Sequence, residues 1–257
     1  MTEYVKSPNL PDKTSAVILG EKYSDLFEIP LKKWGIDTIK VPDNPCVDKR
    51  LSGHADLSVF HFGGNKLLLA PCLKGSGLER ELRDRGASVS FADITQGARY
   101  PSDAQLNSCV VGRNVMFNPS VNCCEIVNYF TNLLDEYNMI SCKQGYARCC
   151  TCVVDEGAII TSDRGIAAAA RKKGIEVLEI SAGHIALEGF LYGFIGGASF
   201  KLEKNILAFT GTLDRHPDRE AIGQFLFLRK VHPVYITQEP VFDIGSAIPI
   251  IEKRASF

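Results

Sequence analysis

The stretch CTCVVDEGAIITSDRGIAAAARKKGIEVLEISAG, residues 150–183, decides the fold. Two apolar strands flank a short turn that ends at Gly157, and Ser162-Asp163 then supplies a helix cap. The amphipathic helix that follows ends at Gly174, because a glycine just past a helix end adopts the left-handed conformation that stops it. An alternating strand comes next. The stretch therefore predicts a strand–strand–helix–strand unit.

The same unit recurs along the chain. LSVFHFGGNKLLLA (57–70) repeats the hairpin, and LRDRGASVSFADI (82–94) and LKKWGIDTIKVPD (31–43) repeat the helix end, the glycine and the strand. Less regular copies cover 108–142, with a helix expected over 121–137, and 198–237. The second strands of the units begin near positions 16, 67, 115, 158 and 206, a spacing typical of repeat folds.

The two ends of the chain complete one another in this scheme. The N-terminal unit lacks a first strand, and the segment 246–251 is a spare strand. If this strand joins the N-terminal unit, five units close into a ring and bury their apolar faces against one another. A doubly wound parallel sheet is the alternative, but it requires βαβα order without hairpins. We therefore expect an α/β propeller of five ββαβ units, spanning 1–257 as a single domain.

Composition sets broad limits on function. Of the 257 residues 45% are hydrophobic and 23% are charged, and the formal net charge is −1. No global basic field favours nucleic acid or lipid, and no apolar run approaches the ~20 residues of a membrane-spanning helix. The first residues, MTEYVKSPNLPDK, contain no apolar signal-peptide core. We expect a cytoplasmic protein with no nucleic-acid or membrane partner.

Nine cysteines raise the question of disulfides or a metal. An odd number in a protein expected to be intracellular argues against a disulfide framework. Cys149, Cys150 and Cys152 form a C-C-x-C cluster, whereas zinc sites use spaced pairs. We therefore expect no metal site. Strand alternation would place Cys150 and Cys152 on one face and Cys149 on the other.

A five-unit ββαβ ring resembles the pentein superfamily, the fold of arginine deiminases, dimethylarginine hydrolases, agmatine deiminases and amidinotransferases. GHADLSVFHFGGNKLLLAP (53–71) is similar to the H-x-D motif that opens an inner strand in these enzymes. The resemblance implies that His54 is the general acid/base and that Asp56 binds the substrate cation, on the same strand face. The other interpretation is that His54 caps a surface loop and Asp56 is solvated.

GYARCCT (145–151) is similar to the segment of these deiminases that carries the nucleophile. The resemblance implies that Cys149 attacks a guanidinium carbon, with Arg148 lowering its pKa and contacting the substrate. The other interpretation is that Cys149 is a small buried apolar side chain, the commonest state of an intracellular cysteine.

The resemblance also implies an acidic residue in the unit before the histidine. FDIGSAIPI (242–250) offers Asp243, which would bind a guanidinium by paired hydrogen bonds. The order His54, Cys149, Asp243 differs from the family order of carboxylate, histidine and cysteine, so the resemblance implies circular permutation. Ser246 lies in the C-terminal segment where a conventional member has its cysteine.

Further polar groups are expected around the same mouth of the ring, because each inner strand begins there. These candidate substrate-binding residues are Asp103, Asn107, His184, Gly196 and Gly197. The two glycines permit close approach of a ligand, or else form a tight turn before a strand.

The combined expectation is a cysteine-dependent hydrolase or transferase for a guanidine-type C–N bond of a small molecule, without metal or organic cofactor. The alternative is a non-catalytic pentein-like protein that binds a small molecule or a macromolecule, as translation initiation factor 6 does with this fold. Whether the chain is an enzyme and which oligomer it forms are left open by the sequence.

Overall fold

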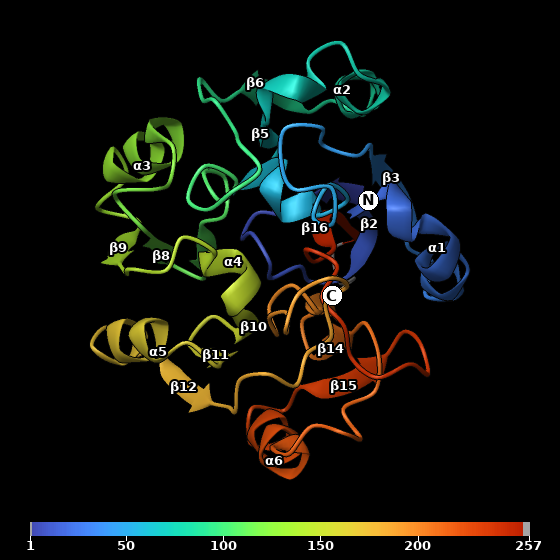
Figure 1. Cartoon of the computed structure of the whole chain (residues 1–257), viewed down its shortest axis with the longest axis vertical. Coiled ribbons are helices and arrows are strands. Elements are labelled where there is room, and N and C mark those ends of the chain that lie inside the picture. Colours follow the sequence, from blue (N-terminus) through green and yellow to red (C-terminus); the bar gives the residue numbers. More distant parts are fainter. Residues whose placement is uncertain (1, 254–257) are drawn as a thin grey trace.

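In the computed structural model, which describes residues 2–253, five small sheets surround a central axis (Figure 1). Five helices lie at the periphery and a sixth, short helix lies near the axis. Each sheet contains an antiparallel inner pair, and its outer strand runs parallel to the middle one. The predicted fold class, an α/β propeller of five ββαβ units, is confirmed.

Four units are built from consecutive segments. Their bounds are β4 (Val59–Gly63), β5 (Lys66–Leu69), α2 (Gly77–Asp84) and β6 (Ser88–Phe91); β7 (Cys109–Val111), β8 (Asn114–Phe117), α3 (Cys124–Thr131) and β9 (Asn138–Ser141); β10 (Cys152–Asp155), β11 (Ala158–Thr161), α5 (Arg164–Arg171) and β12 (Glu176–Glu179); and β13 (Ser199–Glu203), β14 (Ile206–Phe209), α6 (Arg219–Leu228) and β15 (His232–Tyr235).

The fifth unit combines both ends of the chain. Its members are β1 (Thr2–Tyr4), β16 (Ile248–Lys253), β2 (Thr14–Gly20), η1 (Glu21–Tyr23), α1 (Ser24–Lys33) and β3 (Asp37–Val41). Strand β16 lies between β1 and β2 and pairs antiparallel with both, so that Ile248 faces Ile18. The predicted closure by the C-terminal strand is therefore confirmed, and β1 is an additional strand that the pattern did not predict.

Local signals in the sequence account for the helix ends. Asp163 caps α5 by accepting a hydrogen bond from the Ile166 amide over 2.8 Å. Gly86 and Gly174 follow α2 and α5 with φ of +87° and +79°, the left-handed conformation expected of a helix stop. Helix α3 is shorter than the expected 121–137, and the segment after Thr131 forms turns.

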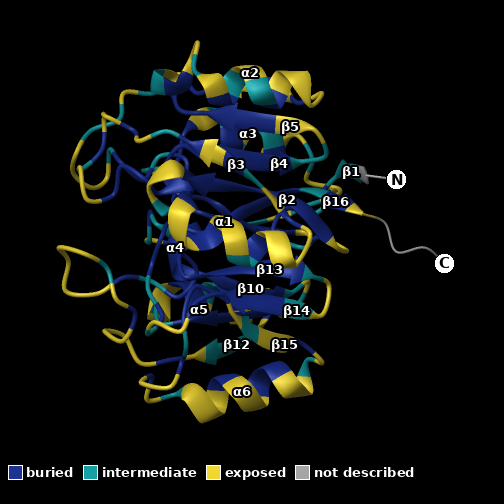
Figure 2. Cartoon of the chain, turned by 90° about the vertical axis from the view of Figure 1, so that its right-hand side faces the viewer, coloured by how far each residue is buried: buried dark blue, intermediate teal, exposed yellow. Residues whose placement is uncertain are grey.

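The core lies between the sheets and beneath the helices, as the burial colours of Figure 2 show. Aromatic side chains join neighbouring units: the ring of Phe60 on β4 meets that of Phe130 on α3 edge-on at 6.1 Å. At the axis β13 contacts β10 and β16, and β16 contacts β4. The inner strands therefore pack against one another around the axis.

Two segments expected to open inner strands are helical instead. Ala55–Leu57 is the 3₁₀ helix η2, and Ala147–Cys150 is the short helix α4. A further 3₁₀ helix, η3, is Pro71–Leu73. The Ser58 amide bonds the Ala55 carbonyl at 3.0 Å, and the Cys150 amide bonds the Tyr146 carbonyl at 2.9 Å. Local hydrogen bonds therefore replace strand pairing here.

The ring has two distinct ends. Helix α4 and long loops lie at one end, and β1 with the outer part of β16 lies at the other (Figure 2). Among residues 2–253 no helix combines the length and the apolar character needed to cross a bilayer.

Candidate functional site

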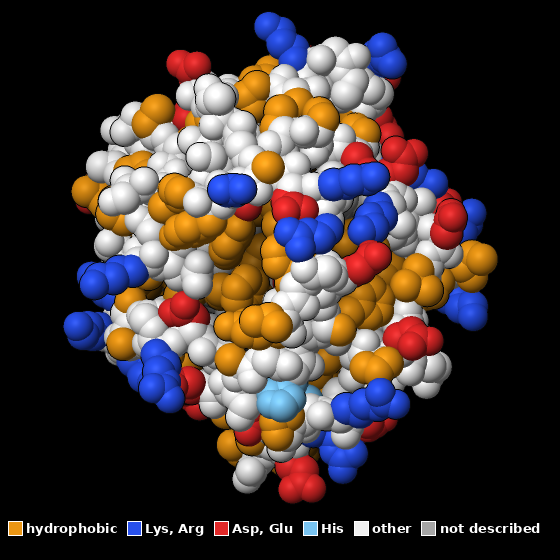
Figure 3. Space-filling model, viewed as in Figure 1, with side chains coloured by type: hydrophobic (Ala, Val, Ile, Leu, Met, Phe, Trp, Pro, Cys, Tyr) orange, Lys and Arg blue, Asp and Glu red, His pale blue; other side chains and the backbone are white. Residues whose placement is uncertain are grey.

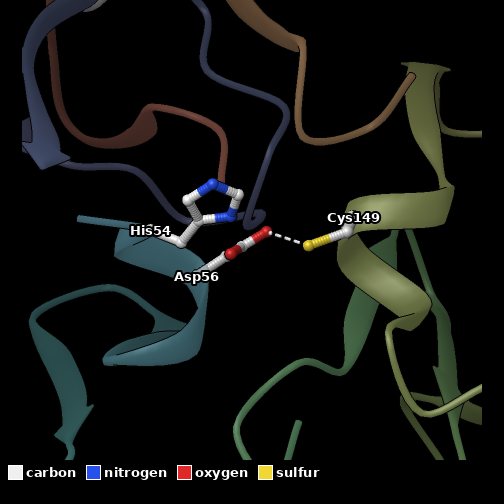
Figure 4. A group of neighbouring side chains, drawn as sticks. All are labelled: His54, Asp56 and Cys149. Atoms are coloured by element: carbon white, nitrogen blue, oxygen red, sulfur yellow. Dashed lines mark hydrogen bonds between the residues drawn. The ribbon is translucent and has the colours of Figure 1, made fainter. Parts of the chain in front are cut away.

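Three predicted residues meet where η2 faces α4 (Figure 4). The Cys149 thiol donates a hydrogen bond to Oδ2 of Asp56 over 2.9 Å, and the His54 ring lies beside them. One donor atom from each side chain lies within 4.8 Å of the other two. The tight turn of η2 brings the side chains of His54 and Asp56 to the same site. The two side chains are close, as expected, but the predicted reason, alternation along a strand, is wrong.

Asp243 approaches His54 from the segment before β16. Its Oδ1 lies 4.0 Å from Nδ1 of His54 and accepts a hydrogen bond from the Gly245 amide at 2.9 Å. Its Oδ2 accepts one from the Phe194 amide at 2.9 Å. The closing strand therefore brings a second buried carboxylate to the site.

Asn107 ties the two sides of the site together. Its Oδ1 accepts from the amides of Arg148 and Cys149 at 2.9 and 3.0 Å. Its Nδ2 lies 3.3 Å from the Cys149 sulfur and 3.2 Å from the carbonyl oxygen of Asp56. This fully buried amide therefore fixes the position of the thiol.

Arg148 is buried and its guanidinium bonds the protein itself. It donates to Oδ1 of Asn9 at 3.1 Å and to Oγ of Ser246 at 2.6 Å. It also donates to the backbone carbonyls of Thr151, Gly196 and Ser199. These bonds use the donors that a substrate would need, and the largest effects on the pKa of Cys149 come from burial and from the charges of Asp56 and Asp243. The geometry gives Arg148 a structural role in place of the expected substrate contact.

Gly196 and Gly197 serve close backbone packing. The Gly197 amide donates to the Cys149 carbonyl at 2.9 Å, and the Gly197 carbonyl accepts from the Ser246 amide at 2.8 Å. A Cβ atom on Gly196 would overlap the carbonyl of Cys149, and one on Gly197 would overlap the Asp243 carboxylate. The space beside these two glycines is therefore occupied by the protein's own backbone and by the Asp243 side chain.

The remaining predicted residues lie farther out. Asp103 is buried and its Oδ2 accepts a hydrogen bond from the Tyr146 hydroxyl at 2.7 Å. His184 is exposed, and its ring contacts that of His216 at 5.5 Å. Asp103 thus orients a side chain of the pocket wall, whereas His184 does not line the pocket.

The cysteine cluster divides differently from the expectation. Cys149 borders the pocket, Cys150 joins the core beneath α5, and Cys152 joins the core around β14. Cys149 and Cys150 belong to a helix, so strand alternation does not apply to them, and the placement of Cys150 with Cys152 on one face was wrong.

Burial dominates the electrostatics of the site. It raises the pKa of the Cys149 thiol well above its usual range, and the charges of Asp56 and Asp243 add to this effect. Burial and the Asp243 charge raise the pKa of Asp56 to about 7. Burial lowers the pKa of His54, against the opposing effect of Asp243. Burial thus disfavours the charged form of all three groups, and a bound cation would favour the ionised thiol and carboxyl groups.

A cavity of about 310 Å³ opens above these groups. Its apolar wall is visible as the orange hollow near the centre of the face in Figure 3. The lining residues are Leu51, His54, Leu57, Tyr146, Cys149, Leu187, Phe190, Leu191, Tyr192, Phe194 and Asp243. The sequence interpretation missed the apolar side chains of the loop 187–194, for which the run Phe190-Leu191-Tyr192 between two glycines was a usable signal.

His54, Asp56 and Cys149 also form a possible metal-binding group. Imidazole, carboxylate and thiolate are all zinc ligands, and three protein ligands leave a position open for substrate in catalytic zinc sites. The expectation of no metal site rested on the cysteine clusters and on the metal-free chemistry that the resemblance implies, and it did not consider this combination.

Comparison with known proteins places the chain in a family. A family model described as a family of unknown function, DUF6873, matches residues 18–248. The chain belongs to DUF6873. A search of curated proteins found no match for this DUF6873 protein.

Solved structures similar to the DUF6873 protein share its ring. An inosamine-phosphate amidinotransferase from Streptomyces griseus has a TM-score of 0.57 and 11% identity, with 98% of each chain covered. A saxitoxin-pathway amidinotransferase from Microseira wollei has a TM-score of 0.56 and 14% identity, covering 93% of this chain and 96% of its own. The agmatine deiminase of C. jejuni has a TM-score of 0.54 and 10% identity, with 91% of each covered. The DUF6873 protein therefore shares the ring fold of these enzymes, as the resemblance in the sequence implied.

Proposed function

We propose that this DUF6873 protein is a cysteine-dependent enzyme that cleaves or transfers a C–N bond of a small guanidine or amidine. The observation that carries the proposal is the buried Cys149 thiol, 2.9 Å from Asp56 and beside His54, at the base of a pocket. The similarity of the fold to amidinotransferases and an agmatine deiminase supports it.

Substrate binding would place the planar cation against the carboxylates of Asp56 and Asp243. Opposite charge lowers the pKa of buried acidic groups, so the same cation that binds would promote ionisation of Cys149. The thiol proton passes to Asp56, to which it is already hydrogen-bonded. This coupling keeps the thiol inert in the absence of a cationic substrate.

The first chemical step forms a bond between the Cys149 sulfur and the central carbon of the guanidinium. The tetrahedral adduct then loses one nitrogen, as ammonia or as an amine, and this nitrogen takes up the proton that the thiol released. Asp56, which received that proton, returns it either directly or through His54, which lies beside both groups. The product of this step is an amidino group bonded to sulfur.

The second step releases the enzyme. Water, or an acceptor amine in a transferase, attacks the same carbon and loses a proton to His54 or Asp56. The carbon–sulfur bond breaks and the sulfur recovers its proton. Two buried residues act indirectly as positioning residues: Asn107 holds the thiol, and Asp103 holds Tyr146 in the pocket wall.

Thiol labelling tests the proposal with a matched pair of reagents. 2-Chloroacetamidine carries the amidinium charge, and 2-chloroacetamide is its neutral counterpart. We expect the amidine to modify Cys149 at least about tenfold faster, since one pKa unit changes the thiolate fraction tenfold. The reaction should disappear in Cys149→Ser and persist in Cys124→Ser, which removes an exposed thiol. Modification of exposed cysteines alone, with Cys149 untouched, contradicts the proposal.

The cluster within 4.8 Å favours one second candidate, a zinc-dependent hydrolase that uses His54, Asp56 and Cys149 as ligands. Dialysis of the purified protein against zinc, followed by metal analysis, distinguishes the zinc-dependent hydrolase from the covalent cysteine enzyme. Stoichiometric zinc that is lost in Cys149→Ser, with hydrolysis abolished by a chelator, supports the metal enzyme. Activity that survives the chelator supports the covalent mechanism.

A further inference from the structure

The wall of the pocket around Cys149 is almost wholly apolar. Eight of its lining residues are leucine, phenylalanine or tyrosine, and the ionisable groups Cys149, His54 and Asp243 lie at its base. Of the described residues that line it, none is lysine or arginine. A bound guanidinium would therefore project its substituent into an apolar space.

The nearby cations at the rim already have anionic partners. Lys22 pairs with Glu188 at 3.4 Å, and Arg50 pairs with Asp48 at 2.6 Å. Arg50 is held further, because its Nη1 donates to the Gly189 carbonyl at 2.6 Å. A substrate carboxylate would have to break one of these pairs to gain a cationic partner.

The loop 187–194 presents apolar side chains to solvent at the mouth. Leu191 is 98% exposed, and Phe190 and Tyr192 are also exposed. The guanidinium of Arg50 lies 4.1 Å from the centre of the Phe190 ring and supports this part of the loop. A contiguous exposed apolar patch beside a pocket is typical of a surface that a ligand covers.

We propose that the substrate is a guanidine or amidine whose substituent is an uncharged alkyl or aryl group, without the carboxylate of an amino acid. This inference rests on the function proposed above and adds the substrate class. The cation binds at Asp56 and Asp243, and the apolar group packs between the leucines of the wall and the aromatic side chains of the loop. A cavity of about 310 Å³ accommodates a group of this kind beyond the guanidinium.

Two N-substituted 2-chloroacetamidines of equal length test the inference. The N-pentyl and N-(4-carboxybutyl) reagents differ only in the end group, a methyl or a carboxylate. The second-order rate of Cys149 modification is measured by intact-protein mass spectrometry. We expect the pentyl reagent to react at least tenfold faster, and the rate to rise about fourfold per methylene from methyl to pentyl, from the free energy of burying a methylene.

A pair of phenylalanine variants localises the effect. Phe190→Ala should reduce the pentyl-to-carboxybutyl rate ratio at least threefold. Phe227→Ala, which removes a phenylalanine 78% exposed on α6 and outside the pocket, should leave the ratio unchanged. Equal effects of the two variants would overturn the assignment of the loop.

The outcomes separate the two proposals. Rapid modification of Cys149 by the parent 2-chloroacetamidine, combined with equal rates for the pentyl and carboxybutyl reagents, would overturn the substrate class alone. Failure of every amidine to modify Cys149 would overturn the proposed function and the substrate class together.

Discussion

The Cys149 sulfur and the Asp56 carboxylate lie 2.9 Å apart although 93 residues separate them in sequence. Both groups are buried, and burial raises the pKa of each. Since two adjacent acidic groups cannot both ionise cheaply away from water, the pair holds at least one proton at neutral pH. The resting thiol is therefore a weak nucleophile.

Replacing Asp56 by Asn tests this relationship. The change removes a negative charge that raises the pKa of Cys149, so neutral iodoacetamide should modify Cys149 faster than in the unaltered protein. It also removes a carboxylate for the amidinium. The ratio of the amidine rate to the amide rate should therefore fall at least about tenfold. Asp214→Asn is the control, because the Asp214 side chain is 70% exposed. If Asp56→Asn left the ratio of the amidine rate to the amide rate unchanged, the Asp56 carboxylate would be excluded from substrate binding.

Stability should depend on pH through the same carboxyl group. The pKa of Asp56 rises from 3.8 to about 7 on folding, so between these values the folded chain keeps a proton that the unfolded chain has lost. The free energy of unfolding should therefore decrease as pH rises through this window. Urea unfolding at pH 5 and pH 8 measures the decrease. In Asp56→Asn this decrease in the free energy of unfolding should be smaller by at least about 1 kcal/mol. An identical pH dependence in the variant and the unaltered protein would refute the prediction.

Asn107→Ala should loosen the site. The change leaves the Cys149 amide without its acceptor, removes the shorter of two hydrogen bonds from the Arg148 amide and removes a donor from the thiol. Unsatisfied buried groups cost about 1–3 kcal/mol of unfolding free energy. We expect that loss, together with slower modification of Cys149 by the amidine. Asn132→Ala, at an exposed position after α3, should change neither quantity, and a neutral result at Asn107 would deny it the positioning role.

Two glycines with opposite surroundings give a matched pair. A Cβ at position 197 would overlap the Asp243 carboxylate, so Gly197→Ala should displace Asp243 and destabilise the chain by about 1–3 kcal/mol. Gly223 lies in α6 with open space around it, so Gly223→Ala should stabilise the helix by up to about 1 kcal/mol. Thermal unfolding compares them. A stable Gly197→Ala protein with unaltered amidine reactivity would show that Asp243 does not depend on this contact.

Much of the fold was predictable because it repeats. The hairpins, the Asp163 cap and the stops at Gly86 and Gly174 are local signals, and five weak copies reinforce one another. Ring closure followed from a spare strand at one end and a missing strand at the other. Local sequence patterns, together with the number of strands in each unit, were therefore sufficient to predict the five-unit ring.

The site was only partly predictable. The motifs pointed to His54, Asp56, Cys149 and Asp243, but the geometry that joins them depends on helical turns stabilised by long-range contacts such as those of Asn107. Alternation in a strand describes neighbours along the chain and fails where the chain turns.

Arg148 illustrates a second limit of sequence reasoning. A cation next to a candidate nucleophile suggests that it activates the thiol. Its partners, however, come from segments as distant as Asn9 and Ser246, and no local pattern reveals them.

The last strand has a consequence for the newly made protein. Asp243 lies just before β16, and the Gly245 carbonyl accepts a hydrogen bond from the Asp56 amide at 3.2 Å. During synthesis, the segment with Cys149 therefore emerges from the ribosome long before the segment that supplies the second carboxylate. A nascent chain therefore has its thiol but lacks Asp243 beside it until β16 takes its place in the sheet. If the proposed function holds, amidine reactivity would therefore report that β16 has joined its sheet.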